Sequence, residues 1–140
     1  MVLLAGAAGC GEVPEPKDPP ELDRQTFRSE VEPILTRRCA NPSSCHGARG
    51  RPFFLYARRA ARLRPADVYR DPPLTDEEHR ANYHQARSFA VERGGGCELL
   101  TKPLAVGSGG SPHRGDAVFE TRQNREYRAI ADWVHGADGS

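Results

Sequence analysis

The clearest chemical feature of the chain is a histidine that directly follows a cysteine. Cys39, Cys45 and His46 lie together in the segment TRRCANPSSCHG, residues 36–47. Two thiols can form thioether bonds to the vinyl groups of a haem, and a histidine beside the second thiol can bind the iron from one face. The usual motif is C-x-x-C-H, whereas residues 40–44 separate these cysteines. We therefore expect covalent haem c here, with the intervening Asn-Pro-Ser forming an outward turn.

Two other interpretations of this segment remain open. A disulfide between Cys39 and Cys45 would close a short loop and stabilise the domain modestly in an oxidising compartment. A zinc site would combine the two thiols with distant histidines, although the spacing is not that of a zinc finger and His46 is too close to Cys45 to chelate with it easily. The residue types alone favour haem over both.

A haem iron also takes a second axial ligand. The only methionine is Met1, in a segment that we expect to be removed, so the sequence excludes methionine ligation. His113, in the glycine-rich loop 107–115, is the best candidate, because glycine lets a backbone approach a flat macrocycle closely. The alternative is that His113 only braces its own loop and leaves the iron five-coordinate or bound by Lys102.

The remaining histidines and Cys97 are weaker candidates. His79 and His84 are predicted on one helix but about 140° apart around it, so they cannot converge on one metal. His135 is expected beside a helix C-terminus, where its charge would interact favourably with the helix dipole. Cys97 is interpreted as a buried free thiol. A mixed disulfide between Cys97 and either earlier cysteine would remove the haem site.

The first residues predict export. Residues 1–10, MVLLAGAAGC, end in small residues before a cysteine and resemble the end of a lipoprotein signal peptide, with Cys10 as the lipidated residue. The apolar run is short and lacks a basic region, which predicts a start upstream of Met1. Residues 11–22 hold four prolines and predict an extended tether. We expect a lipid-anchored protein on the periplasmic side of the envelope, at the outer membrane.

Helical patterns dominate residues 23–138. Phe27, Val31, Ile34 and Leu35 share one face of a helix, which Pro33 either bends or begins. Residues 53–56 fit a short buried strand or a packed loop. A capping box at Thr75 predicts a helix over 76–91, and residues 97–119 predict a loop. A last helix is expected after Asn124, on the apolar spacing of Tyr127, Ile130, Ala131 and Val134, with Gly136 as its stop.

Composition limits the function. Lys and Arg number 20 against 19 Asp and Glu, and the cations occur in short, scattered groups, which predicts an ordinary mixed-charge surface and no nucleic-acid partner. Gly and Pro are abundant and apolar residues make up 37% of the chain, so the core is modest and the loops are long. No hydrolase triad, phosphate loop or paired-carboxylate motif is apparent, which argues against an enzyme.

The stretch from Phe27 onward resembles a family of cytochrome c-like domains common in secreted proteins of myxobacteria and planctomycetes. The matching segments are Phe27-x3-Val31-x-Pro33-Ile34-Leu35, Cys39…Cys45-His46-Gly47, Leu99-Leu100-x-Lys102-Pro103-Leu104, Gly109-Gly110-x2-His113 and Tyr127-x5-Trp133-Val134-x-Gly136-Ala137. The resemblance implies a small helical haem domain that passes electrons, with a histidine at the position of His113.

Together these features predict an all-α, cytochrome c-like domain with long Gly/Pro-rich loops over residues 23–138. The expected function is electron transfer by an exported lipoprotein that carries haem c and meets a redox partner protein. Cys39, Cys45, His46 and His113 are the expected haem-binding residues, with the two histidines as iron ligands. The alternative is a cofactor-free, disulfide-stapled interaction or structural module of the cell envelope.

Overall fold

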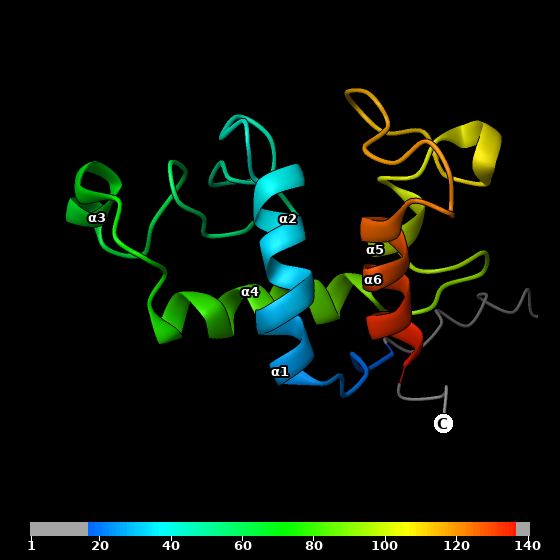
Figure 1. The fold of residues 1–140 in the computed structure, drawn as a ribbon, viewed down its shortest axis with the longest axis horizontal. Coiled ribbons are helices and arrows are strands. Elements are labelled where there is room, and N and C mark those ends of the chain that lie inside the picture. Colours follow the sequence, from blue (N-terminus) through cyan, green and yellow to red (C-terminus); the bar gives the residue numbers. More distant parts are fainter. Residues whose placement is uncertain (1–16, 137–140) are drawn as a thin grey trace, which may run out of the picture.

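The structure is a computed structural model that describes residues 17–136, and every regular element in that range is helical. This confirms the all-α class. The longer elements are α2 (Glu32–Arg38), α4 (Asp76–Phe89) and α6 (Arg125–His135). In Figure 1, α2 and α6 stand beside each other while α4 runs across them, and α3 (Pro65–Arg70) lies at the opposite end of the molecule from α6.

The first helical segment is continuous from residue 24 to 38 but changes its winding. A short α1 (Arg24–Thr26) leads into a π-helical stretch, η1 (Phe27–Val31), and then into α2. The Asp23 carboxylate accepts the Thr26 N–H at 2.6 Å and so caps the start. Pro33 occupies the first turn of α2, where a missing N–H costs little. Because the helical backbone already begins at residue 24, Pro33 marks the return to α-helical winding after η1 and is not the start of the helix.

The two helices that were predicted from their N-caps are present as α4 and α6. At α4, the Thr75 hydroxyl accepts the Glu78 N–H and the Glu78 carboxylate accepts the Thr75 N–H, which is a complete capping box. At α6, the Asn124 side chain accepts the N–H groups of the first turn. These caps satisfy backbone donors that a helix start otherwise leaves unpaired.

The core forms where these helices meet. Phe27 is 1% exposed, and its ring centre lies 5.6 Å from that of Tyr83 on α4 and 5.1 Å from that of Trp133 on α6. Edge-on and tilted aromatic contacts of this kind add to the stabilisation from burial alone. The Trp133 indole N–H also donates to the Asp23 carbonyl at 2.8 Å, which fixes the start of the chain's first helix against α6.

The sequence analysis ends the extended tether at residue 22, but the folded part of the chain begins before that residue. Leu22 is buried, and its carbonyl accepts the Tyr83 hydroxyl at 2.6 Å. The Arg87 guanidinium donates to the carbonyls of Pro19 and Pro20. Residues 19–22 therefore lie against α4, because a proline-rich segment without N–H donors still offers carbonyls to an arginine.

One local prediction is wrong, and one helix was not predicted. The loop predicted over 97–119 contains a short helix α5 (Glu98–Thr101) and a 3-10 turn η2 (Val106–Ser108), and α3 is a further helix without a prediction. The buried side chains of Leu99 and Leu100 explain α5, because one turn of helix directs both into the core. Residues 53–56, predicted as strand or loop, form a loop.

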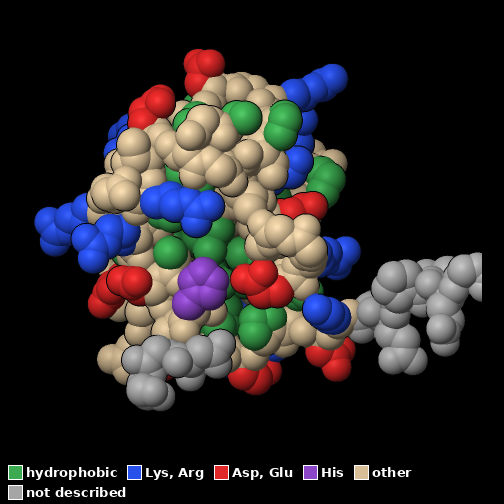
Figure 2. Space-filling view, turned by 90° about the vertical axis from the view of Figure 1, so that its right-hand side faces the viewer, with side chains coloured by type: hydrophobic (Ala, Val, Ile, Leu, Met, Phe, Trp, Pro, Cys, Tyr) green, Lys and Arg blue, Asp and Glu red, His purple; other side chains and the backbone are tan. Residues whose placement is uncertain are grey.

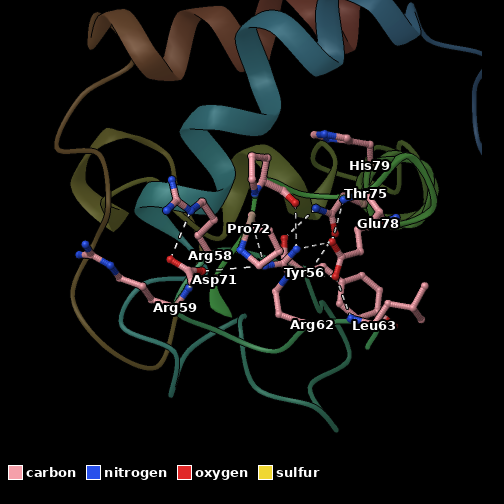
Figure 3. Close-up of polar contacts among 12 residues, drawn as sticks. Tyr56, Arg58, Arg59, Arg62, Leu63, Asp71, Pro72, Thr75, Glu78 and His79 are labelled. Carbon is pink, nitrogen blue, oxygen red and sulfur yellow. Dashed lines mark hydrogen bonds and ion pairs between the residues drawn. The ribbon is translucent and has the colours of Figure 1, made fainter. Parts of the chain in front are cut away.

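A buried ion pair holds the long loop between α2 and α4. The Arg62 and Glu78 side chains are both fully buried, and the guanidinium donates to both carboxylate oxygens at 3.0 and 2.9 Å. Arg62 also donates to the carbonyls of Pro72 and Pro73, while Glu78 accepts the Leu63 N–H. Figure 3 shows these groups converging on one another. Every strong donor and acceptor of the pair has a partner, which a buried charge requires.

Candidate functional site

The residues predicted to bind haem lie on two segments far apart in the chain. Cys39 ends α2, and Cys45 and His46 follow in the next loop. His113 comes from the loop between η2 and α6. The structure brings the two histidines together: their ring centres are 5.9 Å apart and their planes are inclined by 21°. We call His46 and His113 the histidine pair.

The loop between the cysteines folds back on itself as a turn. The Cys45 N–H donates to the Pro42 carbonyl and the His46 N–H donates to the Cys39 carbonyl, both at 3.0 Å. Residues 41–45 are exposed. The five extra residues thus bulge outward, as the sequence predicts, while the two ends of the loop stay close. Gly47 permits this, since a Cβ there would lie 2.5 Å from the Ala40 carbonyl oxygen.

His46 is held in one orientation. Its Nδ1 lies 2.9 Å from the Phe53 carbonyl oxygen, and a carbonyl can only accept, so Nδ1 carries the proton. The other ring nitrogen, Nε2, is then the one with a free lone pair. The imidazole also packs on the Phe53 ring, at 5.0 Å between centres, and Phe53 in turn contacts Phe89 of α4. The imidazole is therefore both oriented and set against apolar side chains.

His113 is positioned by its loop. The Ser111 N–H donates to the Thr101 carbonyl at 2.8 Å, which ties the loop to α5. Gly110 lies so close to Leu104 that a Cβ would fall 1.8 Å from the Leu104 carbonyl oxygen. The glycine expected to let the backbone approach a macrocycle therefore lets the loop pack on its own chain, and this packing directs His113 toward His46.

The surroundings of His113 favour its neutral imidazole. Burial lowers the pKa of His113, and the charges of His46 and Lys102 lower it further. The His113 Nδ1 is buried and has no hydrogen-bond partner within the described part of the chain. An unprotonated imidazole is the form that binds a metal. Lys102 is the alternative ligand, and its Nζ lies 3.4 Å from the Pro112 carbonyl oxygen.

The three cysteines among residues 17–136 are all free thiols, and they differ in exposure. Cys45 is exposed. Cys39 is 8% exposed, and burial raises the pKa of its thiol to about 12, with nearby Cys45 adding to the rise and Arg38 opposing it. Cys97 is buried, as predicted, and burial raises its pKa as well. Thioether formation at Cys39 therefore requires local opening that Cys45 does not need.

The other histidines have different surroundings. The His79 Nδ1 lies 2.5 Å from a carboxylate oxygen of Glu32, and the second oxygen accepts Asn82 at 2.8 Å. This buried cluster was missed by the sequence analysis, because Glu32 lies beside the apolar face of the helix and its spacing alone does not indicate burial. His84 is exposed on α4. His135, at the end of α6 as predicted, lies 3.5 Å from Glu92.

Other kinds of site are not apparent between residues 17 and 136. No group of three or more His, Cys, Asp or Glu side chains is close enough there to hold a metal ion. A zinc site built from both thiols and distant histidines thus lacks its ligand set. In the same range, no helix has the length and apolarity to cross a membrane. Cys10, the predicted lipidation site, lies outside the described residues.

Comparisons with protein-family models, with curated proteins and with solved structures gave no match for this chain. Its function is therefore argued from the histidine pair and its surroundings.

Proposed function

We propose that this helical domain carries haem c and transfers electrons, and that His46 and His113 would bind the iron. The observation that carries the proposal is the meeting of two imidazoles from distant loops, 5.9 Å apart. Imidazole nitrogen is a donor that haem iron binds, and the closeness of the two rings would offer two such donors at one place. The donor set of the pair fits a haem iron.

The surrounding residues support the same role. The hydrogen bond from His46 Nδ1 to the Phe53 carbonyl keeps Nε2 free, which is how metal-binding histidines are usually oriented. The lowered pKa of His113 keeps its imidazole unprotonated and able to bind. The Phe53 and Phe89 rings make the surroundings apolar and limit the access of water. Bound haem would supply a one-electron iron couple, whose potential the axial ligands and the apolar surroundings tune.

The proposal includes covalent attachment and export. Cys45 and Cys39 would form the two thioethers, with the exposed thiol of Cys45 reacting more easily. Cys10 would be lipidated, so that the domain is held by its lipid on the periplasmic side of the outer membrane and exchanges electrons with a partner protein. Intact mass of the protein isolated from its host tests the anchor, since an unmodified segment 1–10 would contradict it.

Expression with the haem-maturation machinery tests the haem proposal. The expected result is an intense Soret band, a low-spin spectrum, and haem that stays with the protein in acid acetone. His113→Ala should convert the spectrum to high spin, because one axial ligand is lost. His84→Ala is the matched control, since His84 is an exposed histidine away from the pair. A full-length, folded protein without a Soret band would contradict the proposal, and an unchanged spectrum in His113→Ala would exclude that residue as ligand.

The second candidate is a cofactor-free module stapled by a Cys39–Cys45 disulfide. It is favoured by the closeness of the two ends of their loop, where His46 N–H meets the Cys39 carbonyl. In this structure both thiols are free, and a disulfide would require their Cβ atoms to lie about 4 Å apart. Thiol titration of the exported protein before and after treatment with dithiothreitol separates the candidates, because reduction releases two thiols from a disulfide and none from thioether bonds to haem.

A further inference from the structure

Acidic residues are absent from one long stretch of the sequence, so that positive charge is concentrated there. Between Glu32 and Asp67 there is no acidic residue, and this stretch holds eight arginines, namely Arg37, Arg38, Arg49, Arg51, Arg58, Arg59, Arg62 and Arg64. Since the whole chain has 20 cationic and 19 acidic residues, the rest of it carries the balancing negative charge. The near-zero net charge therefore conceals a basic region that contains the Cys45-His46 segment.

Half of these arginines are already paired with carboxylates. Arg37 and Arg38 bind Glu126, Arg58 binds Asp71, and Arg62 is buried with Glu78. The other four are exposed and make no ion pair within the described residues: Arg49, Arg51, Arg59 and Arg64. We call these four the cationic surface. Their charges are available to a ligand.

Two of the four arginines, Arg49 and Arg59, line one hollow, and the other two lie next to residues at or beside its rim. A depression of about 420 Å³ separates the loop after Cys45 from α3, and its lining includes Ser43, Arg49, Arg59 and Pro65 but no acidic residue. Arg64 precedes Pro65. The Arg51 guanidinium donates to the Ser44 carbonyl at 3.0 Å, next to that rim. A hollow that is lined by no carboxylate and is edged by guanidinium groups concentrates positive electrostatic potential.

Two features give this surface the chemistry of a protein interface. The Arg49 guanidinium is preorganised, since it donates to the Arg62 carbonyl at 2.7 Å and lies over the Tyr56 ring. On α3, beside the hollow, Tyr69 is 91% exposed and Val68 is 48% exposed. Exposed tyrosine together with arginine is typical of protein–protein contacts. The opposite end of the molecule differs, since Figure 2 shows both signs of charge interspersed there.

We propose that the cationic surface docks an acidic polypeptide segment on a partner protein, with one carboxylate side chain in the hollow and Tyr69 packed at its edge. A lipid surface fits less well. Interfacial membrane binding by a helix buries a large apolar face in the lipid, whereas α3 has only six residues and the basic site beside it is concave. The proposal does not depend on haem, because it rests on the arginines and the hollow.

The test uses the full-length protein and a fluorescein-labelled oligo-glutamate peptide, followed by fluorescence anisotropy at increasing salt. The expected result is binding that weakens with salt, and a further loss of about tenfold or more when R49E, R51E, R59E and R64E are combined. The control combines R80E, R93E, R125E and R128E, which change the net charge equally at exposed arginines elsewhere. That control should change the affinity by less than about twofold.

A second variant guards against misfolding of the fourfold change. Arg59 and Arg64 make no side-chain hydrogen bond within the described residues, so R59E with R64E leaves the Arg49 and Arg51 contacts intact. This pair should still weaken peptide binding several-fold. Equal losses in the control, or no salt-dependent binding by the native protein, would overturn the proposal. So would binding to vesicles of phosphatidylglycerol and phosphatidylcholine without binding to the peptide, which would assign the surface to a membrane.

Discussion

Two partly buried histidines in this protein have opposite surroundings. His79 is held by the Glu32 carboxylate, whose other oxygen accepts Asn82, and Asn82 also bonds both backbone groups of Tyr56. His113 has a buried nitrogen without a hydrogen-bond partner in the described structure, and its ring lies beside that of His46. A satisfied polar cluster stabilises the fold. A buried polar group without a hydrogen bond does not stabilise the fold in this way, so its presence in a native protein needs another explanation. For His113 we propose ligand binding.

The same contrast extends to the arginines. Arg62 is buried and fully bonded, whereas the cationic surface is exposed and unpaired. Stability should therefore depend on Arg62, Glu78 and Glu32, and binding on His113 and the exposed arginines. Mutations can separate the two sets because they share few contacts.

The largest effect is expected for Arg62→Met. Removing the guanidinium leaves the Glu78 carboxylate charged and buried, which typically costs about 3–5 kcal/mol. Urea unfolding of the protein without haem measures the free energy of unfolding. The double variant R62M/E78Q should recover part of the loss, because it removes the uncompensated charge. A loss below about 1 kcal/mol for Arg62→Met would contradict a structural role for the pair.

Acid should weaken the same pair. Burial alone would raise the pKa of Glu78, but hydrogen bonds from Arg62, Leu63 and Thr75 and the Arg62 charge hold it at about 2. Because the folded pKa lies below the ordinary 4.5, the contribution of Glu78 is complete above pH 4.5 and is lost as the pH falls toward 2. We expect a loss of about 2–3 kcal/mol across that range. Glu78→Gln should flatten the profile there, and an unchanged slope would refute this assignment.

A smaller effect is expected for Glu32→Gln. The amide still accepts one hydrogen bond but loses the charge that stabilises its bonds to His79 and Asn82, which we expect to cost about 1–2 kcal/mol. Glu126→Gln is the matched control. Glu126 pairs with Arg37 and Arg38 near the surface, where an ion pair contributes about 1 kcal/mol or less. Urea midpoints of the two variants give the comparison, and an equal loss in both would contradict the difference in burial.

The sequence predicted the helices with complete local signals and missed contacts between distant residues. Thr75 and Asn124 mark the starts of α4 and α6 in the sequence, because N-capping involves only residues within one turn of the cap. The Arg62–Glu78 pair depends on tertiary packing, which local spacing does not encode. The α3 helix buries no side chain and carries Pro65 in its first turn, a local signal that the sequence analysis did not use. Of the candidate site, the outward turn before Cys45 and the approach of His113 to His46 were predicted. The burial of Cys39 and the packing role of Gly110 were not.

The smallest change in stability is expected at the histidine pair itself. His113→Phe keeps a ring of similar size and removes a buried nitrogen that has no partner, so no hydrogen bond is lost. In the protein without haem, the free energy of unfolding at pH 7.5 should therefore stay within about 0.5 kcal/mol of the native value or rise.

The pH dependence of the free energy of unfolding should change in His113→Phe. Because the folded pKa of His113 lies below its ordinary 6.5, its neutral form contributes stability that is complete above pH 6.5 and lost as the pH falls. Urea unfolding between pH 7.5 and 5 should show a shallower decline in His113→Phe than in the native protein. His84→Phe, at an exposed site, should keep the native slope. A large loss of stability at pH 7.5 would mean that His113 braces its loop, and the contrast with His79 would then disappear.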